Sequence, residues 1–260
     1  MSEHSYYSLS SPVYVTQRRE DGMLDLKGEI FGTCFAVTPE VFLTAGHVVE
    51  SVANAPHGQP TIGLFDGAGF RQWGAPIEDT EVLPCDLGLL RAGKAPEPIA
   101  NHVLPLVWSE EPLGWCDDVE TYGYAFGIHR GAKATVVLRA FKGQVVADPV
   151  DFVRGSDSFH VYELSFQAPV GLSGAPLFTR NQKQQLHVHG VIIGNSSSSM
   201  LVFRAQEQLV EPAGVVITER HESLSMGIAV HGSVILATGS RILDSTIGEV
   251  LRAAGKMAAS

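Results

Sequence analysis

The chain is poor in cysteine and in long apolar segments, and both shortages narrow the class of protein. It has only three cysteines in 260 residues, Cys34, Cys85 and Cys116. An odd, low count is a poor basis for a disulfide framework, so we expect three free thiols that act as small buried hydrophobes. No apolar run reaches the ~20 residues of a membrane-spanning helix. These features argue against a domain held together by disulfides and against a membrane-spanning protein.

Basic residues are also scarce. Lys and Arg number 18 against 28 Asp and Glu, which gives a net charge of -10 and a pI near 5.4. Nucleic-acid binders usually carry a basic face, and an acidic surface does not favour an anionic membrane. We therefore expect no nucleic-acid partner and no membrane partner. The N-terminal residues lack the basic and apolar regions of a secretory signal, so we expect a cytoplasmic protein.

Turn-forming residues, in contrast, are plentiful. The chain contains 27 Gly and 14 Pro, and 45% of its residues are hydrophobic, which is enough to build a core. Short apolar runs alternate with turn residues, a pattern typical of barrels and sandwiches. The sequence therefore predicts an all-β fold with strands over 12–16, 29–37, 41–45, 61–65, 87–91, 103–108, 119–124, 134–146, 159–166, 175–178, 186–193 and 226–236.

One helix is predicted, at the C-terminus over 244–260. Thr246 and Glu249 have the spacing of a capping box, and apolar residues follow at helical intervals. The polar stretch 196–221 contains four consecutive serines. Its composition predicts an irregular surface loop.

Three short motifs carry the residue types of a serine hydrolase. TAGH ends at His47, DLGLL begins at Asp86, and GLSGAPL contains Ser173. A serine hydroxyl becomes a good nucleophile only when a base takes its proton, and a histidine can do so near neutral pH. An aspartate on the other imidazole nitrogen fixes the tautomer. Glycines beside the serine let backbone N–H groups point at a developing oxyanion.

Other interpretations of these residues remain open at this point. His47 fits a structural histidine in a turn, and Ser173 fits a plain turn serine. Asp66, Asp79 and Glu81 are rivals of Asp86.

A metal site is the other alternative. His187 and His189 share one face of a strand and could bind a metal. A third ligand is not near them in the sequence, so we expect a half-exposed strand, no metal and no cofactor.

Together the motifs resemble the trypsin-like (chymotrypsin-fold) serine peptidases, closest in style to bacterial, disulfide-free HtrA-like protease domains. The resemblance extends over 31–234. Besides the three motifs, it rests on GTCFAV before the histidine motif, YGY at 122–124, GVIIGN at 190–195 and GIAV at 227–230. We expect no PDZ domain, which HtrA proteases carry.

The resemblance implies two six-stranded antiparallel β-barrels and a C-terminal helix. The expected parts are an N-terminal arm (1–11), a first barrel (12–112), a second barrel (113–243) and the helix (244–260). His47 and Asp86 would come from the first barrel and Ser173 from the second. The implied activity is hydrolysis of a protein or peptide substrate through an acyl-enzyme.

The resemblance also assigns the remaining site residues. The N–H groups of Gly171 and Ser173 would form the oxyanion hole. Gln167 would lie at the base of the specificity pocket, where trypsins have Asp, and the walls would be formed by Ile193, Gly194, Asn195 and Gly227. An uncharged base predicts an uncharged P1 residue of small to medium size.

One departure from the family bears on activation. Leu172 stands before Ser173, where secreted trypsins have an acid that receives a newly freed N-terminal ammonium. An apolar side chain cannot satisfy a buried cation, so we expect the intact N-terminus to be compatible with activity. A switch would act by ordering 151–158 or 196–221, for example through a regulatory protein partner. The alternatives to a peptidase are a catalytically silent peptide-binding pseudoprotease and an esterase.

Overall fold

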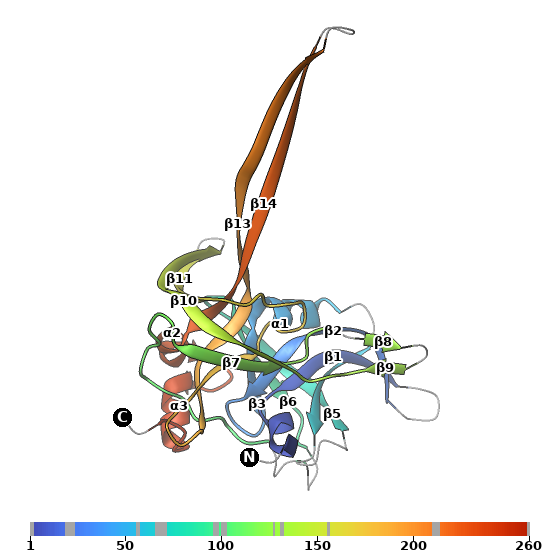
Figure 1. Ribbon diagram of the computed structural model, residues 1–260. Helices are drawn as coiled ribbons and strands as arrows, with labels where there is room; N and C mark the ends of the chain where they lie inside the picture. The colour runs from blue at the N-terminus through green and yellow to red at the C-terminus, as the bar shows by residue number, and fades with distance from the viewer. Residues whose placement is uncertain are drawn as a thin grey trace.

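The structure is a computed structural model that describes residues 3–18, 24–55, 58–65, 72–95, 99, 103–126, 128–130, 133–154, 157–209 and 214–258. Its strands form two closed six-stranded barrels whose neighbouring strands are antiparallel (Figure 1). This confirms the predicted all-β double barrel. Among the helices of the described residues, none has the length and apolar character needed to cross a membrane.

The first barrel has the strand order β1-β2-β3-β6-β5-β4. Its central strands are buried along their length, as in β3, because one face lines the barrel and the other is covered by α1 or the second barrel. A short 3-10 helix, Glu3–Ser8, precedes it. The elements are β1 (Ser11–Arg18), β2 (Leu24–Ala36), β3 (Val41–Ala45), α1 (Gly46–Ala53), β4 (Gln59–Phe65), β5 (Gln72–Leu83) and β6 (Leu87–Ala92).

The second barrel has the order β10-β11-β14-β13-β12-β7. Two short strands, β8 (Ile128–Arg130) and β9 (Lys133–Thr135), form a separate hairpin between β7 and β10. The barrel strands are β7 (Asp118–Gly123), β10 (Arg139–Arg154), β11 (Asp157–Leu164), β12 (Pro176–Arg180), β13 (Leu186–Leu209) and β14 (Gly214–His231).

Strands β13 and β14 continue far beyond the barrel as a two-stranded arm that points away from the rest of the molecule (Figure 1). Their ladder extends from the pair Asn195–Gly227 to the pair Leu209–Gly214. The predicted irregular loop over 196–221 is therefore wrong. The serine run is polar in composition, but each serine faces a residue of β14 in a regular antiparallel register.

Other boundaries differ from the expected ones for local reasons. The predicted strand 103–108 joins no barrel, since Trp108 instead bridges Val188 and Met257. The predicted strand 226–236 ends at His231, because the His231 side chain accepts the N–H of Ser233 and caps α2 (Gly232–Ala237). Strand β5, which no prediction covered, is rich in charged residues and lacks a continuous apolar run.

The C-terminal helix is shorter than predicted. The helix α3 covers Ile247–Ala253, preceded by the short paired strands β15 (Gly239–Ser240) and β16 (Ser245–Thr246). The Thr246–Glu249 capping box is confirmed: the Glu249 N–H donates to Thr246 Oγ1, and the Thr246 N–H donates to Glu249 Oε2. Hydrogen bonds from Ser245 and Thr246 lower the pKa of Glu249 to about 2. Gly255, with φ +65°, follows the last turn, a typical helix end.

A continuous apolar core joins the barrels. One buried cluster contains Phe35 and Leu43 from the first barrel together with Val191 and Val230 from the second. A second cluster, which includes Leu172, fills the second barrel. The two barrels therefore hold each other in one orientation, and the strand ends that face their junction are positioned by packing.

Candidate active site

His47 lies where strand β3 turns into helix α1. Ala45 is the N-cap of α1, and the Gly46 N–H donates to the Asp86 carbonyl oxygen at 2.7 Å. The His47 N–H donates to Asp86 Oδ1 at 2.9 Å. An anion suits this place because the first N–H groups of a helix lack partners within the helix. The start of α1 therefore holds Asp86 beside His47.

Asp86 belongs to the turn between β5 and β6. Cys85 and Asp86 have φ of 63° and 55°, a conformation that aspartate tolerates better than most residues. The side chain of Asp86 is only 4% exposed, and its Oδ2 lies 3.0 Å from His47 Nδ1. A carboxylate can only accept, so this contact places the imidazole proton on Nδ1 and leaves Nε2 as an acceptor. His47 remains 29% exposed, which suits a base that must reach a substrate.

The turn that carries Ser173 is attached to the first barrel through Thr33. The Thr33 N–H donates to the Ser173 carbonyl oxygen at 2.8 Å. The next residue, Gly174, has φ +87°, and a Cβ there would lie 3.0 Å from the Ala45 nitrogen and closer still to Thr33 and Thr44. A side chain at 174 would therefore push the serine turn away from the strand that leads into His47.

Thr33 also orders the preceding turn. Its buried hydroxyl donates to the Gly171 carbonyl oxygen at 2.7 Å and accepts the Tyr124 N–H at 3.0 Å. Nothing in the sequence motif GTCFAV distinguished Thr33 as a functional residue, because its partners lie 91 and 138 residues away. It is a positioning residue at the junction of the barrels.

The backbone of residues 169–172 forms a tight turn directly before Ser173. The Leu172 N–H donates to the Pro169 carbonyl oxygen at 3.0 Å, and Gly171 has φ +92°. This is the pattern of a type II turn. The Val170 carbonyl oxygen accepts the Phe126 N–H at 3.0 Å, which turns the N–H of Gly171 to the opposite side of their shared peptide plane. Within the described part of the chain, the N–H groups of Gly171 and Ser173 donate to no acceptor.

Asp86 forms a second contact, an ion pair that the sequence did not predict. Arg154, at the end of β10, forms an ion pair through its Nη1 with Asp86 Oδ2, the same oxygen that contacts His47 Nδ1. The Arg154 side chain is 45% exposed. It comes from the predicted switch segment 151–158, which forms the paired ends of β10 and β11 where the structure describes it. Sequence reasoning missed it because charge pairing across 68 residues leaves no local pattern.

The predicted pocket residues meet where the arm leaves the second barrel. Asn195 pairs with Gly227, and the Gly227 N–H donates to the Phe166 carbonyl oxygen at 2.7 Å, next to Gln167. The Asn195 amide bonds both the N–H and the carbonyl of Ala168, at 2.7 and 2.8 Å.

The structure places the other pocket residues differently from the expectation. Gln167 is exposed, whereas a pocket base would be enclosed. The side chain of Ile193 lies in the core. Gly194, beside it, has φ +146° and follows a break in the ladder between Ile192 and Gly194.

The rival acids serve another purpose. Asp79 forms two hydrogen bonds with the Arg241 guanidinium, at 3.0 Å each, and these lower the pKa of Asp79. Glu81 accepts from the Ser240 hydroxyl and from two backbone N–H groups. Both acids therefore fasten the C-terminal segment to β5, while Asp66 lies outside the described residues.

The two strand histidines are structural. His189 is buried, with Nε2 2.9 Å from Thr179 Oγ1 and Nδ1 3.0 Å from the Glu111 carbonyl oxygen. Burial lowers the pKa of His189 to about 4, so it is neutral at pH 7. The expected half-exposed strand is wrong for His189, and both of its nitrogens are engaged by protein atoms. Among the described residues, no group of three His, Cys, Asp or Glu side chains is placed to hold a metal.

The three cysteines are free thiols in different environments. Cys34 is buried, and burial raises the pKa of its thiol. Cys85 is half-buried, and the pKa of its thiol is raised by burial and by Asp157. Cys116 is exposed, so the expectation of a small buried hydrophobe holds for Cys34 alone.

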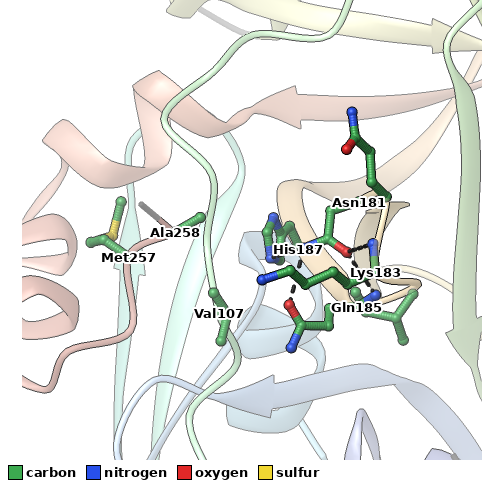
Figure 2. A pocket seen from close by; sticks show the side chains of 9 residues that line it. Val107, Asn181, Lys183, Gln185, His187, Met257 and Ala258 are labelled. Atoms are coloured by element: carbon green, nitrogen blue, oxygen red, sulfur yellow. Dashed lines mark hydrogen bonds between the residues drawn. The ribbon is translucent and has the colours of Figure 1, made fainter. Parts of the chain in front are cut away.

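A hollow of about 740 Å³ lies elsewhere, between the β12–β13 turn and the C-terminal residues (Figure 2). Its polar side chains are bonded to one another: Asn181 Nδ2 donates to Gln185 Oε1 at 3.0 Å, and Asn181 Oδ1 accepts the N–H groups of Lys183 and Gln185. His187 and Met257 complete its lining. The hollow includes neither a nucleophile paired with a base nor any of the predicted triad residues, so the candidate active site stays at His47.

Comparison with known proteins places the fold. No protein-family model and no curated protein sequence matches the chain. Among solved structures, the active form of the Rv3671c protease from M. tuberculosis is similar, with 17% identity, a TM-score of 0.51 and coverage of 98% of this chain and 83% of that one. The apo MamO protease domain from Magnetospirillum magneticum has 16% identity, a TM-score of 0.50 and coverage of 90% and 97%. At such identities the likeness establishes the architecture alone: the chain has the chymotrypsin-like double-barrel fold.

Proposed function

We propose that the chain is a trypsin-like serine endopeptidase that cleaves a protein substrate in the cytoplasm, with His47, Asp86 and Ser173 as its triad. The observation that carries the proposal is the 3.0 Å contact between His47 Nδ1 and the buried Asp86 carboxylate. It leaves Nε2 as the base that a serine nucleophile requires. The similar solved proteins are proteases, which agrees with this assignment.

The reaction would proceed in two halves. Ser173 Oγ attacks the substrate carbonyl carbon while His47 Nε2 takes the hydroxyl proton, and the Gly171 and Ser173 N–H groups bind the oxyanion. The C–N bond then breaks as His47 returns the proton to the leaving amine, which leaves an acyl-enzyme. A water, deprotonated by His47, attacks the ester and releases the acid and Ser173. Asp86 stabilises the imidazolium throughout.

A peptidase assay with matched variants tests the proposal. Purified chain is incubated with a diverse peptide mixture, and new termini are identified by mass spectrometry. We expect cleavage by the wild type and none by Ser173→Ala or His47→Ala, with circular dichroism showing that each variant is folded. Cleavage that persists in Ser173→Ala would contradict the assignment.

A silent binding module is the second candidate, and one observation favours it. The ion pair between Arg154 and Asp86 occupies the carboxylate on which His47 depends. If that pair held the site inactive, the double barrel would bind peptides without cleaving them. The same assay separates the two candidates when it is combined with peptide binding: binding without any new termini would support the module.

A further inference from the structure

The arm formed by β13 and β14 has two faces of different character. Residues paired across an antiparallel ladder point to the same side, so the ladder assigns each residue to a face. We define the Phe203 face by Ser198, Met200, Phe203, Arg220, Glu222 and Leu224, and the Leu201 face by Ser199, Leu201, Arg204, Ile217, Glu219 and His221.

The Leu201 face combines two exposed apolar side chains, Leu201 at 44% and Ile217 at 50%, with a cluster of polar contacts. Arg204 and His221 both pair with Glu219, at 3.4 Å each, and His221 also contacts the Ser199 hydroxyl. The cluster satisfies these charges within the arm.

The Phe203 face carries the more exposed apolar side chains beside an ion pair between Arg220 and Glu222, at 3.6 Å. Met200 is 65% exposed, Phe203 53% and Leu224 59%, and the three lie on successive rungs of the ladder. Contiguous exposed apolar side chains of this kind mark an interaction site.

An arm of this kind needs a partner to be stable. A two-stranded ribbon is marginal in water unless its apolar face is packed against something. Strand β12 pairs with β13 only up to Val191, and β11 pairs with β14 only up to Gly227. Beyond the Asn195–Gly227 pair, the arm therefore has no third strand among the described residues. It extends away from both barrels (Figure 1), and no other part of the described chain covers it.

We propose that the Phe203 face binds the Phe203 face of a second copy of this chain. The face carries one cation and one anion on adjacent rungs: Phe203 pairs with Arg220, and Met200 pairs with Glu222. A two-fold axis that runs across the strands between these rungs would set Arg220 against Glu222 of the second copy. It would also set Phe203 against Met200 of the second copy. The face is therefore complementary to itself in charge, as a two-fold interface requires.

Face-to-face pairing of the arms differs from pairing through their strand edges in the side chains that it buries. Pairing through the open strand edges would extend the sheet but leave Met200, Phe203 and Leu224 in water. Face-to-face pairing covers them and places the two double barrels at opposite ends of the joined arms. Arg220 and Glu222 already form an ion pair within the face, at 3.6 Å, so together they offer little net charge to an anionic lipid surface.

Analytical ultracentrifugation of the full chain over a range of concentrations tests this proposal. The wild type should show a concentration-dependent monomer–dimer equilibrium. Phe203→Glu should weaken the dimer by about tenfold or more, as loss of a central aromatic contact does. Leu201→Glu, the matched change on the other face of the same strand, should leave the equilibrium close to that of the wild type.

A charge exchange gives a second test, in which a mixture of two variants restores the opposite-sign contacts that each variant alone loses. Arg220→Glu alone and Glu222→Arg alone should each weaken self-association, because each sets like charges against each other. An equimolar mixture of the two variants should form a heterodimer, since every cross pair is then of opposite sign. A wild type that is monomeric at all concentrations would overturn the proposal, even if the arm bound vesicles or another protein. So would a mixture no more associated than its components. The measurement reads mass, so it stands or falls independently of peptidase activity.

Discussion

Arg154 and His47 contact the same oxygen of Asp86. The guanidinium comes from the β10–β11 hairpin of the second barrel, while the carboxylate and the imidazole belong to the first. The carboxylate that would stabilise a positive charge on His47 is thus already paired with a cation. This contact links the position of a surface hairpin to the chemistry of the site.

We predict that Arg154→Gln raises turnover. A nearby cation opposes the positive charge that develops on His47, and for a half-exposed pair this amounts to about 1 kcal/mol, or roughly fivefold in rate. The check is kcat at several ionic strengths, since screening should shrink the difference. Arg241→Gln is the matched control because it removes another Arg–Asp ion pair, to Asp79. A lower kcat in Arg154→Gln would mean that Arg154 orients Asp86 instead.

The specificity site should accept an uncharged P1 residue of small to medium size. Gln167 is uncharged and exposed, and the neighbouring Ala168 is held by two hydrogen bonds to the uncharged Asn195 amide. Of the acids that follow Asn195, Glu207 pairs with Val216 far along the ladder, and Glu211 lies outside the described residues. Cleavage of a P1-randomised peptide library measures the preference. We expect Asn195→Gly to admit larger P1 residues, whereas strong selection of Arg or Lys by the wild type would refute a neutral pocket.

Stability should fall as the pH drops from about 6.5 to 4. Burial lowers the pKa of His189 to about 4 from its usual 6.5, so the folded protein binds fewer protons than the unfolded chain in this window. Protonation of the unfolded chain therefore lowers the free energy of unfolding. The loss is about 3 kcal/mol once the pH is below both the folded and the unfolded pKa of His189. Urea unfolding at pH 7.5 and pH 5 measures the change. His189→Gln should flatten this dependence, and the half-buried His187→Gln should not; equal slopes for all three proteins would contradict the assignment.

The intact N-terminus should be compatible with activity. Leu172 is fully buried in the apolar cluster of the second barrel, where a buried ammonium would find no counter-charge. The 169–172 turn is already formed by its own hydrogen bonds. Intact-mass spectrometry beside the peptidase assay is the check. Activity that arises only after removal of a defined N-terminal piece would show that this explanation is wrong.

The sequence predicted the double barrel because strands such as β3 and β6 are buried runs bounded by turn residues, and the motifs lie at their ends. It brought His47 and Asp86 together correctly, since these two are hydrogen-bonded in the structure. The sequence did not predict the arm formed by β13 and β14. Serine composition suggested an irregular loop, while the register that orders the serine run pairs Ser196 with Met226 and Ser199 with Ser223, which are distant in the sequence.

Contacts between distant strands were equally hidden. Thr33 in its GTCFAV strand and Arg154 in its hairpin look ordinary locally, and their importance comes only from the docking of one barrel on the other. Gln167 precedes Ala168, whose carbonyl oxygen accepts the Asn195 amide from 27 residues away, so the exposure of Gln167 likewise depends on a distant contact. Short motifs identify the candidate catalytic residues. Tertiary packing determines which other side chains contact them.

The most direct test of the central claim is covalent labelling with a fluorophosphonate, which reacts with a serine only when a base and an oxyanion hole activate it. We predict labelling of the wild type at Ser173, located by peptide mass spectrometry. Labelling should be lost in Ser173→Ala and His47→Ala and strongly slowed in Asp86→Asn, a change that lowers kcat on the order of 10⁴-fold in the Ser-His-Asp triad of a serine protease. A folded wild-type protein that is not labelled, or is labelled at another serine, would contradict the account.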